Sequence, residues 1–284
     1  MGPTRQATGG WGGRPVARWD GGSVCEMIRG VPGGSGANMA DPNAVSPECA
    51  SCAAVWGKSG ATHCWSADPA AAPPAPRACP TRAHAPTVEG TLLAYLDGGE
   101  DARIARVAAR VEGLCYQRTE GGAVHARWTR VEDTVAFARL MGWKRIGIAT
   151  CIGLLEETRR LEQILRAQAL DPVSVCCKVG SVDKEKLGVA DSEKVRPGTF
   201  EPACNPVAQA RILNDVGTDL NVIVGLCVGH DILFTRHSRA PVTTLVVKDR
   251  VTGHNPVAVL YGQPFYYRRL VTGRVEIPEG GSEE

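Results

Sequence analysis

Short apolar runs alternate with amphipathic helical patterns through the second half of the chain. Four runs of apolar and β-branched residues predict strands at 144–150, 173–179, 220–226 and 243–248. Helical patterns lie between them at 155–168 and 205–216, and a shorter helix is expected after Gly229. Strands separated by helices are typical of a parallel sheet with both faces covered. The sequence therefore predicts an α/β fold, a small doubly wound, Rossmann-like parallel sheet with helices on both faces.

Three more helical patterns come before the first strand. Two of them cover about 88–97 and 100–116, where apolar residues recur on one helical face. The third is introduced by a capping box, in which Thr129 is followed three residues later by Glu132, and it ends at Gly142.

The remaining segments predict a chain of four parts. Residues 1–44 are rich in glycine and show no helical or strand period, so a disordered tail is expected, and Met39 suggests that the true start lies further downstream. Residues 45–86 form a cysteine-rich segment that is too poor in apolar residues to build its own core and is expected to bind metal. The α/β domain is predicted at 87–272 and a flexible C-terminal tail at 273–284.

Composition excludes several classes of protein. The chain has 284 residues, of which 43% are apolar and 22% charged, with a net charge of +2. This balance is ordinary for a globular protein and gives no basic stripe for nucleic acid. No apolar run reaches the roughly 18 residues that cross a bilayer, and no secretory signal is recognisable. A cytoplasmic protein without membrane or nucleic-acid partners is expected. Its oligomeric state stays open.

Phosphate-binding loops are also missing from the sequence. Neither G-x4-G-K-[ST] nor a G-x-G-x-x-G motif lies between a strand and a helix. No nucleotide cofactor is therefore predicted.

Cysteine is the residue type that carries the most chemical information here, with eleven in the chain. In a reducing compartment, cysteines are more often ligands or reactive thiols than structural disulfides. The first group has the spacing C-x2-C-x11-C-x14-C and consists of Cys49, Cys52, Cys64 and Cys79. A C-x2-C pair places two sulfurs on one tight turn, as zinc sites require. A metal site is predicted at these four residues, with His63 as an alternative to Cys64.

A second group follows the predicted strands. Cys151 and Cys227 come directly after the first and third strands, Cys204 precedes a helix, and Cys176 and Cys177 alternate across the second strand, so one of that pair can face a shared site. Ligands of open α/β sheets bind beyond the carboxyl ends of the strands. Converging thiols suit a zinc or an iron–sulfur centre. The predicted cofactor-binding residues are Cys151, Cys177, Cys204 and Cys227, although buried cysteines also serve as small apolar core residues.

Polar residues beside these cysteines are candidates for catalysis. Cys204 stands at a helix start, where the backbone N–H groups lower the pKa of a thiol. His230 and Lys178 lie within a few residues of Cys227 and Cys177 and are suited to proton transfer or anion binding. The predicted catalytic residues are therefore Cys204, His230 and Lys178.

Several longer segments agree, in order, with one known family. They are the C-x2-C pair, Cys79-Pro80, ATCIGL, VCCKVGS, EKVRPGTFEPACNPVAQARILN, TDLNVIVGLCVGHD, PVTTLVVKDRVTGHNP and YYRRL. From about residue 48 to 270 the chain resembles an uncharacterised prokaryotic family of cysteine-rich proteins described as metal-binding. The resemblance implies metal ligation by Cys49, Cys52 and Cys79.

Three functions remain open from the sequence. The first is a metalloprotein with a zinc or iron–sulfur centre at the sheet edge, which performs redox or sulfur chemistry on a small molecule of unknown identity. The second is a metal-binding or thiol-sensing module without catalysis. The third is an interaction protein in which only the N-terminal zinc matters and the later cysteines fill the core.

Overall fold

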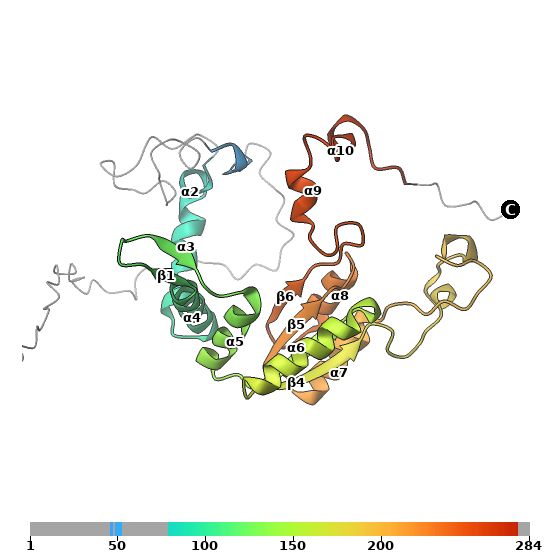
Figure 1. The fold of residues 1–284 in the computed structure, drawn as a ribbon, viewed down its shortest axis with the longest axis horizontal. Coiled ribbons are helices and arrows are strands. Elements are labelled where there is room, and N and C mark those ends of the chain that lie inside the picture. The colour runs from blue at the N-terminus through green and yellow to red at the C-terminus, as the bar shows by residue number, and fades with distance from the viewer. Residues whose placement is uncertain (1–45, 48, 53–78, 278–284) are drawn as a thin grey trace, which may run out of the picture. The chain divides into compact units, whose positions relative to one another are not determined.

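The structure, a computed structural model, describes residues 46–47, 49–52 and 79–277 (Figure 1). The chain divides into two compact units, Met1–Ala85 and Pro86–Glu284. In the first unit, the described elements are a short 3-10 helix η2 (Cys49–Ser51) and α2 (Pro80–Ala83). Helix α3 (Ala85–Leu96) begins at the boundary, and none of its residues is buried.

A four-stranded parallel sheet organises the second unit. Its strands are β3 (Arg145–Thr150), β4 (Asp171–Cys176), β5 (Leu220–Val224) and β6 (Val242–Val246), in the order β4-β3-β5-β6. The chain thus leaves β3 first toward one edge of the sheet and later toward the other. The predicted α/β class with a parallel sheet is confirmed, and the order of the strands changes direction between β3 and β5.

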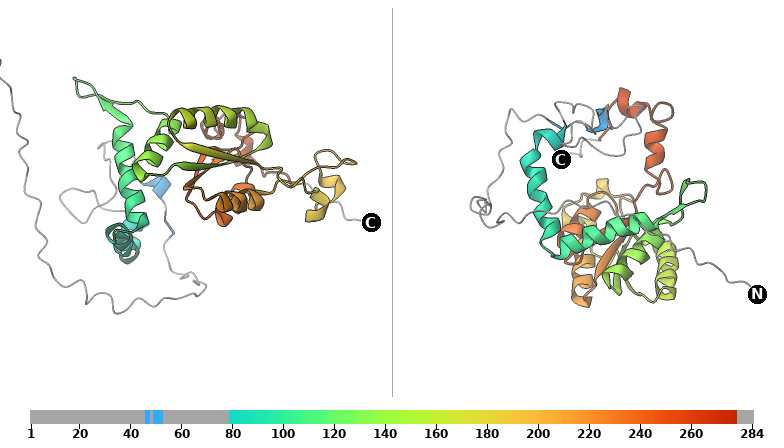
Figure 2. Two further views of the ribbon diagram at one scale, coloured as in Figure 1. Left: turned by 90° about the horizontal axis from the view of Figure 1, so that it is seen from below. Right: turned by 90° about the vertical axis from the view of Figure 1, so that its left-hand side faces the viewer.

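Helices pack on both faces of this sheet. Helix α6 (Leu155–Ala167) covers one face, while α7 (Pro206–Val216) and α8 (His230–His237) lie on the other (Figure 2). All five residues of β5 are buried, because this central strand is covered on both sides. The core that results joins the apolar residues of β3 and β5 to those of α6, α7 and α8, including Ile146, Ile148, Leu165, Leu213, Val222 and Phe234.

Helix α5 (Arg130–Met141) begins and ends as its sequence predicts. The Thr129 backbone N–H donates to Glu132 Oε2 over 2.7 Å, and the Glu132 N–H donates back to Thr129 Oγ1. Gly142 ends the helix at a φ of 69°, which glycine adopts without strain. Helix α4 (Glu100–Leu114) packs against α5.

Strand β4 departs most from its predicted range. It begins at Asp171 and ends at Cys176, whereas the pattern of apolar residues predicts 173–179. Pro172 reads as a strand breaker, but β4 is an edge strand, where a missing N–H is tolerated. Cys177 therefore lies just beyond the strand.

A short hairpin and the C-terminal helices complete the second unit. Strands β1 (Tyr116–Arg118) and β2 (Val124–Ala126) pair in antiparallel fashion. Helices α9 (Val257–Tyr261) and α10 (Arg269–Thr272) contain no buried residues. None of the helices in the described part of the chain combines the length and the apolar character needed to span a bilayer.

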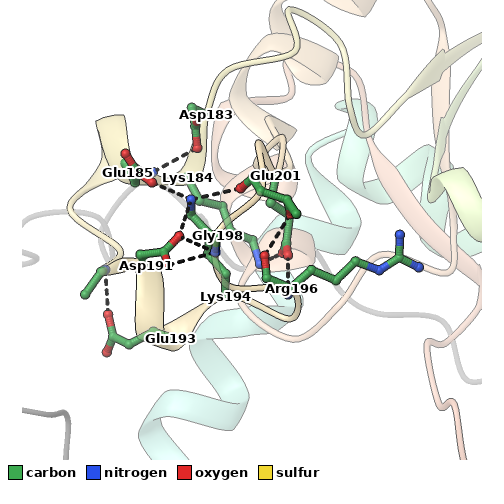
Figure 3. A network of polar contacts seen from close by, with 11 residues as sticks. Asp183, Lys184, Glu185, Asp191, Glu193, Lys194, Arg196, Gly198 and Glu201 are labelled. Carbon is green, nitrogen blue, oxygen red and sulfur yellow. Dashed lines mark hydrogen bonds and ion pairs between the residues drawn. The ribbon is translucent and has the colours of Figure 1, made fainter.

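The long connection between β4 and α7 is held by a network of charged groups (Figure 3). It contains the 3-10 helices η4 (Lys184–Leu187) and η5 (Asp191–Glu193). The Lys194 side chain is 2% exposed, and its ammonium contacts Glu185, Asp191 at 2.9 Å and the Thr199 carbonyl at 3.0 Å. Because these groups come from both halves of the connection, Lys194 closes it into a compact lobe.

Replacing Lys194 with methionine is expected to loosen this lobe. The change leaves two carboxylates without their shared cation, so limited proteolysis should cut between residues 184 and 201 several-fold faster than in the wild type. Lys186→Met, at an exposed position of η4, is the matched control and should leave the rate unchanged. Equal cleavage of the two variants would show that the Lys194 contacts do not hold the lobe.

Candidate thiolate centre

Four cysteines lie beyond the carboxyl ends of the strands. Cys151 directly follows β3, Cys177 directly follows β4, and Cys227 comes shortly after β5. Cys204 precedes Asn205, the residue that caps α7. β3 and β5 are neighbours in the sheet, so their loops leave the same edge side by side.

Backbone hydrogen bonds extend the sheet to these loops. The Cys151 N–H donates to the Val224 carbonyl over 3.0 Å, and the Cys177 N–H donates to the Thr150 carbonyl over 2.8 Å. The Asn205 N–H then donates to the Cys177 carbonyl over 2.7 Å. Cys151, Cys177 and Cys204 are thereby fixed by the same backbone ladder.

The thiol of Cys177 occupies the middle of the group. Its residue is 1% exposed, and its Sγ accepts a hydrogen bond from the Ile152 N–H at 3.3 Å. The same thiol lies near those of Cys151 and Cys204 and interacts with both of them. Cys151 is also buried, whereas Cys204 and Cys227 are half-buried. Three cysteines that are far apart in the sequence thus lie close enough together for Cys177 to influence the pKa of both of the others.

These contacts separate the pKa values of the three thiols. The hydrogen bond from Cys177, helped by the Gly153 N–H and by Lys248, lowers the pKa of Cys151 to about 5. The same Cys177 hydrogen bond, with Lys178 and His230 nearby, lowers the pKa of Cys204 to about 5. Cys177 has a strongly raised pKa, because its proton is shared with the two neighbouring thiolates. At neutral pH the group therefore holds two thiolates and one thiol.

Each outer cysteine has a cation beside it. Lys248 lies near Cys151 and Lys178 lies near Cys204, and each lysine lowers the pKa of the thiol beside it. Arg250 Nη2 donates to Cys227 Sγ over 3.1 Å, and this contact raises the pKa of the guanidinium further. The negative charge of the thiolates is balanced locally by these side chains.

Of the predicted catalytic residues, all three lie at this group. Cys204 is one of the contacting thiols, and Lys178 donates to the Pro202 carbonyl over 2.5 Å while facing Cys204. His230, at the start of α8, is close enough to Cys204 to lower its pKa. Cys176 is the last residue of β4, where it is half-buried and packs against the core.

Gln209 supports the group from below and is not apparent from the sequence. Its side chain on α7 is fully buried, and Nε2 donates to the Val175 carbonyl over 2.6 Å and to the Thr150 carbonyl over 3.2 Å. The Thr150 carbonyl thus accepts from both Gln209 and the Cys177 N–H. In the sequence, Gln209 is one polar residue of an amphipathic helical pattern, and this pattern does not indicate that its side chain binds two carbonyls. The sequence pattern likewise predicts Lys248 only as the last residue of a strand and does not indicate that it lies near Cys151.

The N-terminal cysteines belong to the other unit. Cys49 begins the 3-10 helix η2, and the Cys52 N–H donates to the Cys49 carbonyl over 3.2 Å, so the C-x2-C pair lies on one tight turn. Cys79 caps α2. Cys64 and His63 lie outside the described residues.

No set of three or more His, Cys, Asp or Glu side chains within residues 46–47, 49–52 and 79–277 has an arrangement that would hold a metal ion. Cys151, Cys177, Cys204 and Cys227 together are called the thiolate centre. Within it, the strongly raised pKa of Cys177 means that this thiol keeps its proton beside Cys151 and Cys204. A metal ion would have to displace that proton, as metal binding to thiols generally does.

The lowered pKa of Cys204 predicts its reactivity. In protein stripped of metal by a chelator, only the thiolate reacts with iodoacetamide, so the alkylation rate should rise as the pH passes about 5 and then level off. Cys115 serves as the internal control, because burial and the nearby Asp133 and Glu112 raise the pKa of its thiol. Peptide mass spectrometry measures both rates. A Cys204 rate that rises only above about pH 8, like that of a free thiol, would contradict this assignment.

Two comparisons place the chain among known sequences. A family model described as "Protein of unknown function (DUF1847)" matches residues 79–245. The chain is also 45% identical, over 175 residues, to the uncharacterized protein MJ0455 of Methanocaldococcus jannaschii, an alignment that covers 62% of this chain and 83% of that protein. The matched family segment contains all four cysteines of the thiolate centre.

Proposed function

The chain belongs to the DUF1847 family of proteins of unknown function, and we propose that its thiolate centre binds a soft metal, as a zinc ion or an iron–sulfur cluster. Redox or sulfur chemistry on a small molecule is the activity that such a centre supports. The fold is proposed to be Rossmann-like, with the centre at the point where the strand order changes direction, where open α/β sheets bind their ligands. A cytoplasmic location is proposed with it, since free thiols persist in reducing compartments.

The observation that carries the proposal is that one backbone ladder brings Cys151, Cys177 and Cys204 together at the carboxyl ends of β3 and β4, where Cys177 influences the pKa of both neighbours. A nucleophilic cysteine needs one thiol and a redox pair needs two. Here three cysteines lie close together, and a fourth, Cys227, lies on the adjoining loop beside Arg250. Thiolates are the ligands that select zinc and iron–sulfur clusters. Four neighbouring cysteines therefore fit a zinc ion or an iron–sulfur cluster better than they fit a single nucleophilic cysteine.

Charge in the centre supports the same conclusion. Four thiolates around a divalent ion leave a net negative charge, which is costly in a half-buried site. Lys178, Lys248 and Arg250 already lie against the sulfurs and offset it. Two of the thiols are ionised at neutral pH before any metal arrives, so fewer protons must be released on binding.

The bound metal would supply a Lewis acid or an electron carrier. Around it, Lys178 and His230 are placed to hold an anionic group or to move a proton at Cys204. Gln209 keeps the ends of β3 and β4 together beneath the sulfurs.

A second metal site is proposed in the N-terminal unit. The Cys49–Cys52 turn, together with Cys79 and either Cys64 or His63, would hold a structural zinc ion. The tight turn of the C-x2-C pair supports this assignment.

Cobalt(II) titration tests the thiolate centre separately from the N-terminal site. The metal-free full chain with Cys49, Cys52 and Cys79 replaced by serine should still develop thiolate-to-cobalt charge-transfer absorbance in the near ultraviolet. Adding Cys151→Ser and Cys204→Ser to this variant should abolish the absorbance. If the absorbance fails to appear in the first variant, or persists in the second, the proposed centre is wrong.

The contact of a thiol with two thiolates also favours a second candidate, a thiol-sensing module without catalysis. Hydrogen peroxide would oxidise Cys177 and either Cys151 or Cys204 to a disulfide, with loss of the two thiol hydrogens and formation of two water molecules. Mass spectrometry of metal-free protein detects this crosslink. Readily reversible formation with no metal retained in purified protein would favour the sensor over the metal centre.

A further inference from the structure

A cavity of about 450 Å³ lies at the opposite end of the sheet from the thiolate centre. It is open to solvent on one side and is lined by α4, α5, Trp143 and the first residues of β5 and β6, Leu220 and Val242. The cysteines of the thiolate centre follow the other ends of the strands. The cavity is therefore a separate site, which the proposed metal chemistry does not use.

Most of the wall of this cavity is apolar. Ile104 and Val111 contribute from α4, and Val242 contributes from the edge strand. The rings of Phe137 and Trp143 meet edge to face, with centroids 5.6 Å apart, and form a rigid aromatic side. The volume of the cavity falls within the range of sites that bind small molecules, and such sites typically have an apolar wall with few polar groups.

The polar groups of the cavity are mainly acidic. Asp133 and Glu112 line it together with one cation, Arg130. The Arg130 guanidinium is held against the cavity wall, since its Nη2 donates to Oγ1 of Thr243, another lining residue, over 2.9 Å. The pKa of the Cys115 thiol, which also lines the cavity, is raised by burial and then by Asp133 and Glu112. Two carboxylates and one guanidinium leave the lining with a formal charge of −1.

Asp133 has an oxygen that lacks a partner. Its Oδ1 is shielded from solvent and makes no hydrogen bond in the part of the chain that the structure describes. A buried carboxylate oxygen without a donor is costly, so its retention beside an apolar cavity indicates a donor that arrives with a ligand.

We propose that this cavity binds a small apolar molecule carrying one protonated amine, whose ammonium group donates to Asp133. The aromatic side formed by Phe137 and Trp143 takes the apolar body. An anion of the same size is rejected, because its charge would face Asp133 and Glu112.

Binding of three probes of similar shape tests the proposal on the full chain. Phenethylamine is the cation, 3-phenylpropionate the anion and propylbenzene the neutral molecule. The indole N–H resonance of Trp143, assigned with Trp143→Phe, reports binding by NMR. Phenethylamine should shift this resonance and bind at least about tenfold more tightly than 3-phenylpropionate. Asp133→Asn should remove that preference, whereas Glu157→Gln, an exposed carboxylate on α6, should keep it.

A further variant guards against a folding defect in Asp133→Asn. Ala108→Phe fills the cavity from α4 and should block phenethylamine without touching the carboxylate. The proposal is overturned if cation and anion bind equally to the wild type, if no probe shifts the Trp143 resonance, or if Ala108→Phe leaves phenethylamine binding intact.

Discussion

Cys177→Ser should lower the metal bound at the thiolate centre at least about tenfold, because a serine hydroxyl stays protonated and is a poor ligand for soft metals. Cys177 is the residue that interacts with both Cys151 and Cys204, so its loss removes the group that links the other two. The pKa of Cys204 should rise back toward that of a free thiol, since the hydrogen bond from Cys177 is the largest cause of its lowering. Elemental analysis and the pH dependence of alkylation measure the two effects.

Cys176→Ser is the matched control for this experiment. Cys176 is the preceding residue, but it packs against the core and is not among the groups that shift the pKa of Cys151, Cys177 or Cys204. Its replacement should leave the metal content and the pKa of Cys204 unchanged. Equal loss of metal from both variants would point to a general weakening of β4 and would contradict a specific role for Cys177.

Gly225→Ala should destabilise the protein by about 3 kcal/mol, through two separate costs. Gly225 follows β5 with a φ of +70°, a conformation that is strained for alanine. A Cβ at this position would also lie 1.9 Å from Leu154 Cδ1, and Leu154 is buried in the core. Urea unfolding followed by circular dichroism measures the change as a shift in midpoint at constant slope.

Gly217→Ala separates the two costs. Gly217 ends α7 with a φ of +72°, but nothing lies within 4 Å of the position of its Cβ. Alanine there should cost only about 1 kcal/mol, which is the backbone strain alone. If both substitutions have the same effect, the close contact with Leu154 is not a constraint on the loop that leads to Cys227.

The sequence predicts the position of the thiolate centre because parallel strands impose it. In a parallel sheet the carboxyl ends of all strands lie on the same side, so the residues that follow the strands gather there. Cys151 and Cys227 follow strands that are neighbours, and the alternation of side chains predicts that Cys176 and Cys177 point to opposite faces. Local patterns were enough for this part of the site.

Other features depend on contacts between distant segments and leave no local pattern. Gln209 is one polar residue on an amphipathic helix, and only the packing of α7 against β3 and β4 gives it two carbonyls to bind. The sequence predicts a strand that extends to Lys248, but β6 ends at Val246, where its pairing with β5 becomes irregular. The cavity at Asp133 joins α4 and α5 to strands that come about a hundred residues later, and no periodicity indicates it.

Elemental analysis of protein purified without oxygen tests the central proposal most directly. The full chain with Cys49, Cys52 and Cys79 replaced by serine removes the N-terminal contribution, and Cys177→Ser in the same background is the reference. The thiolate centre predicts stoichiometric zinc, or iron with matching inorganic sulfide, that is lost in the reference. No more metal in the parent than in the reference would contradict it.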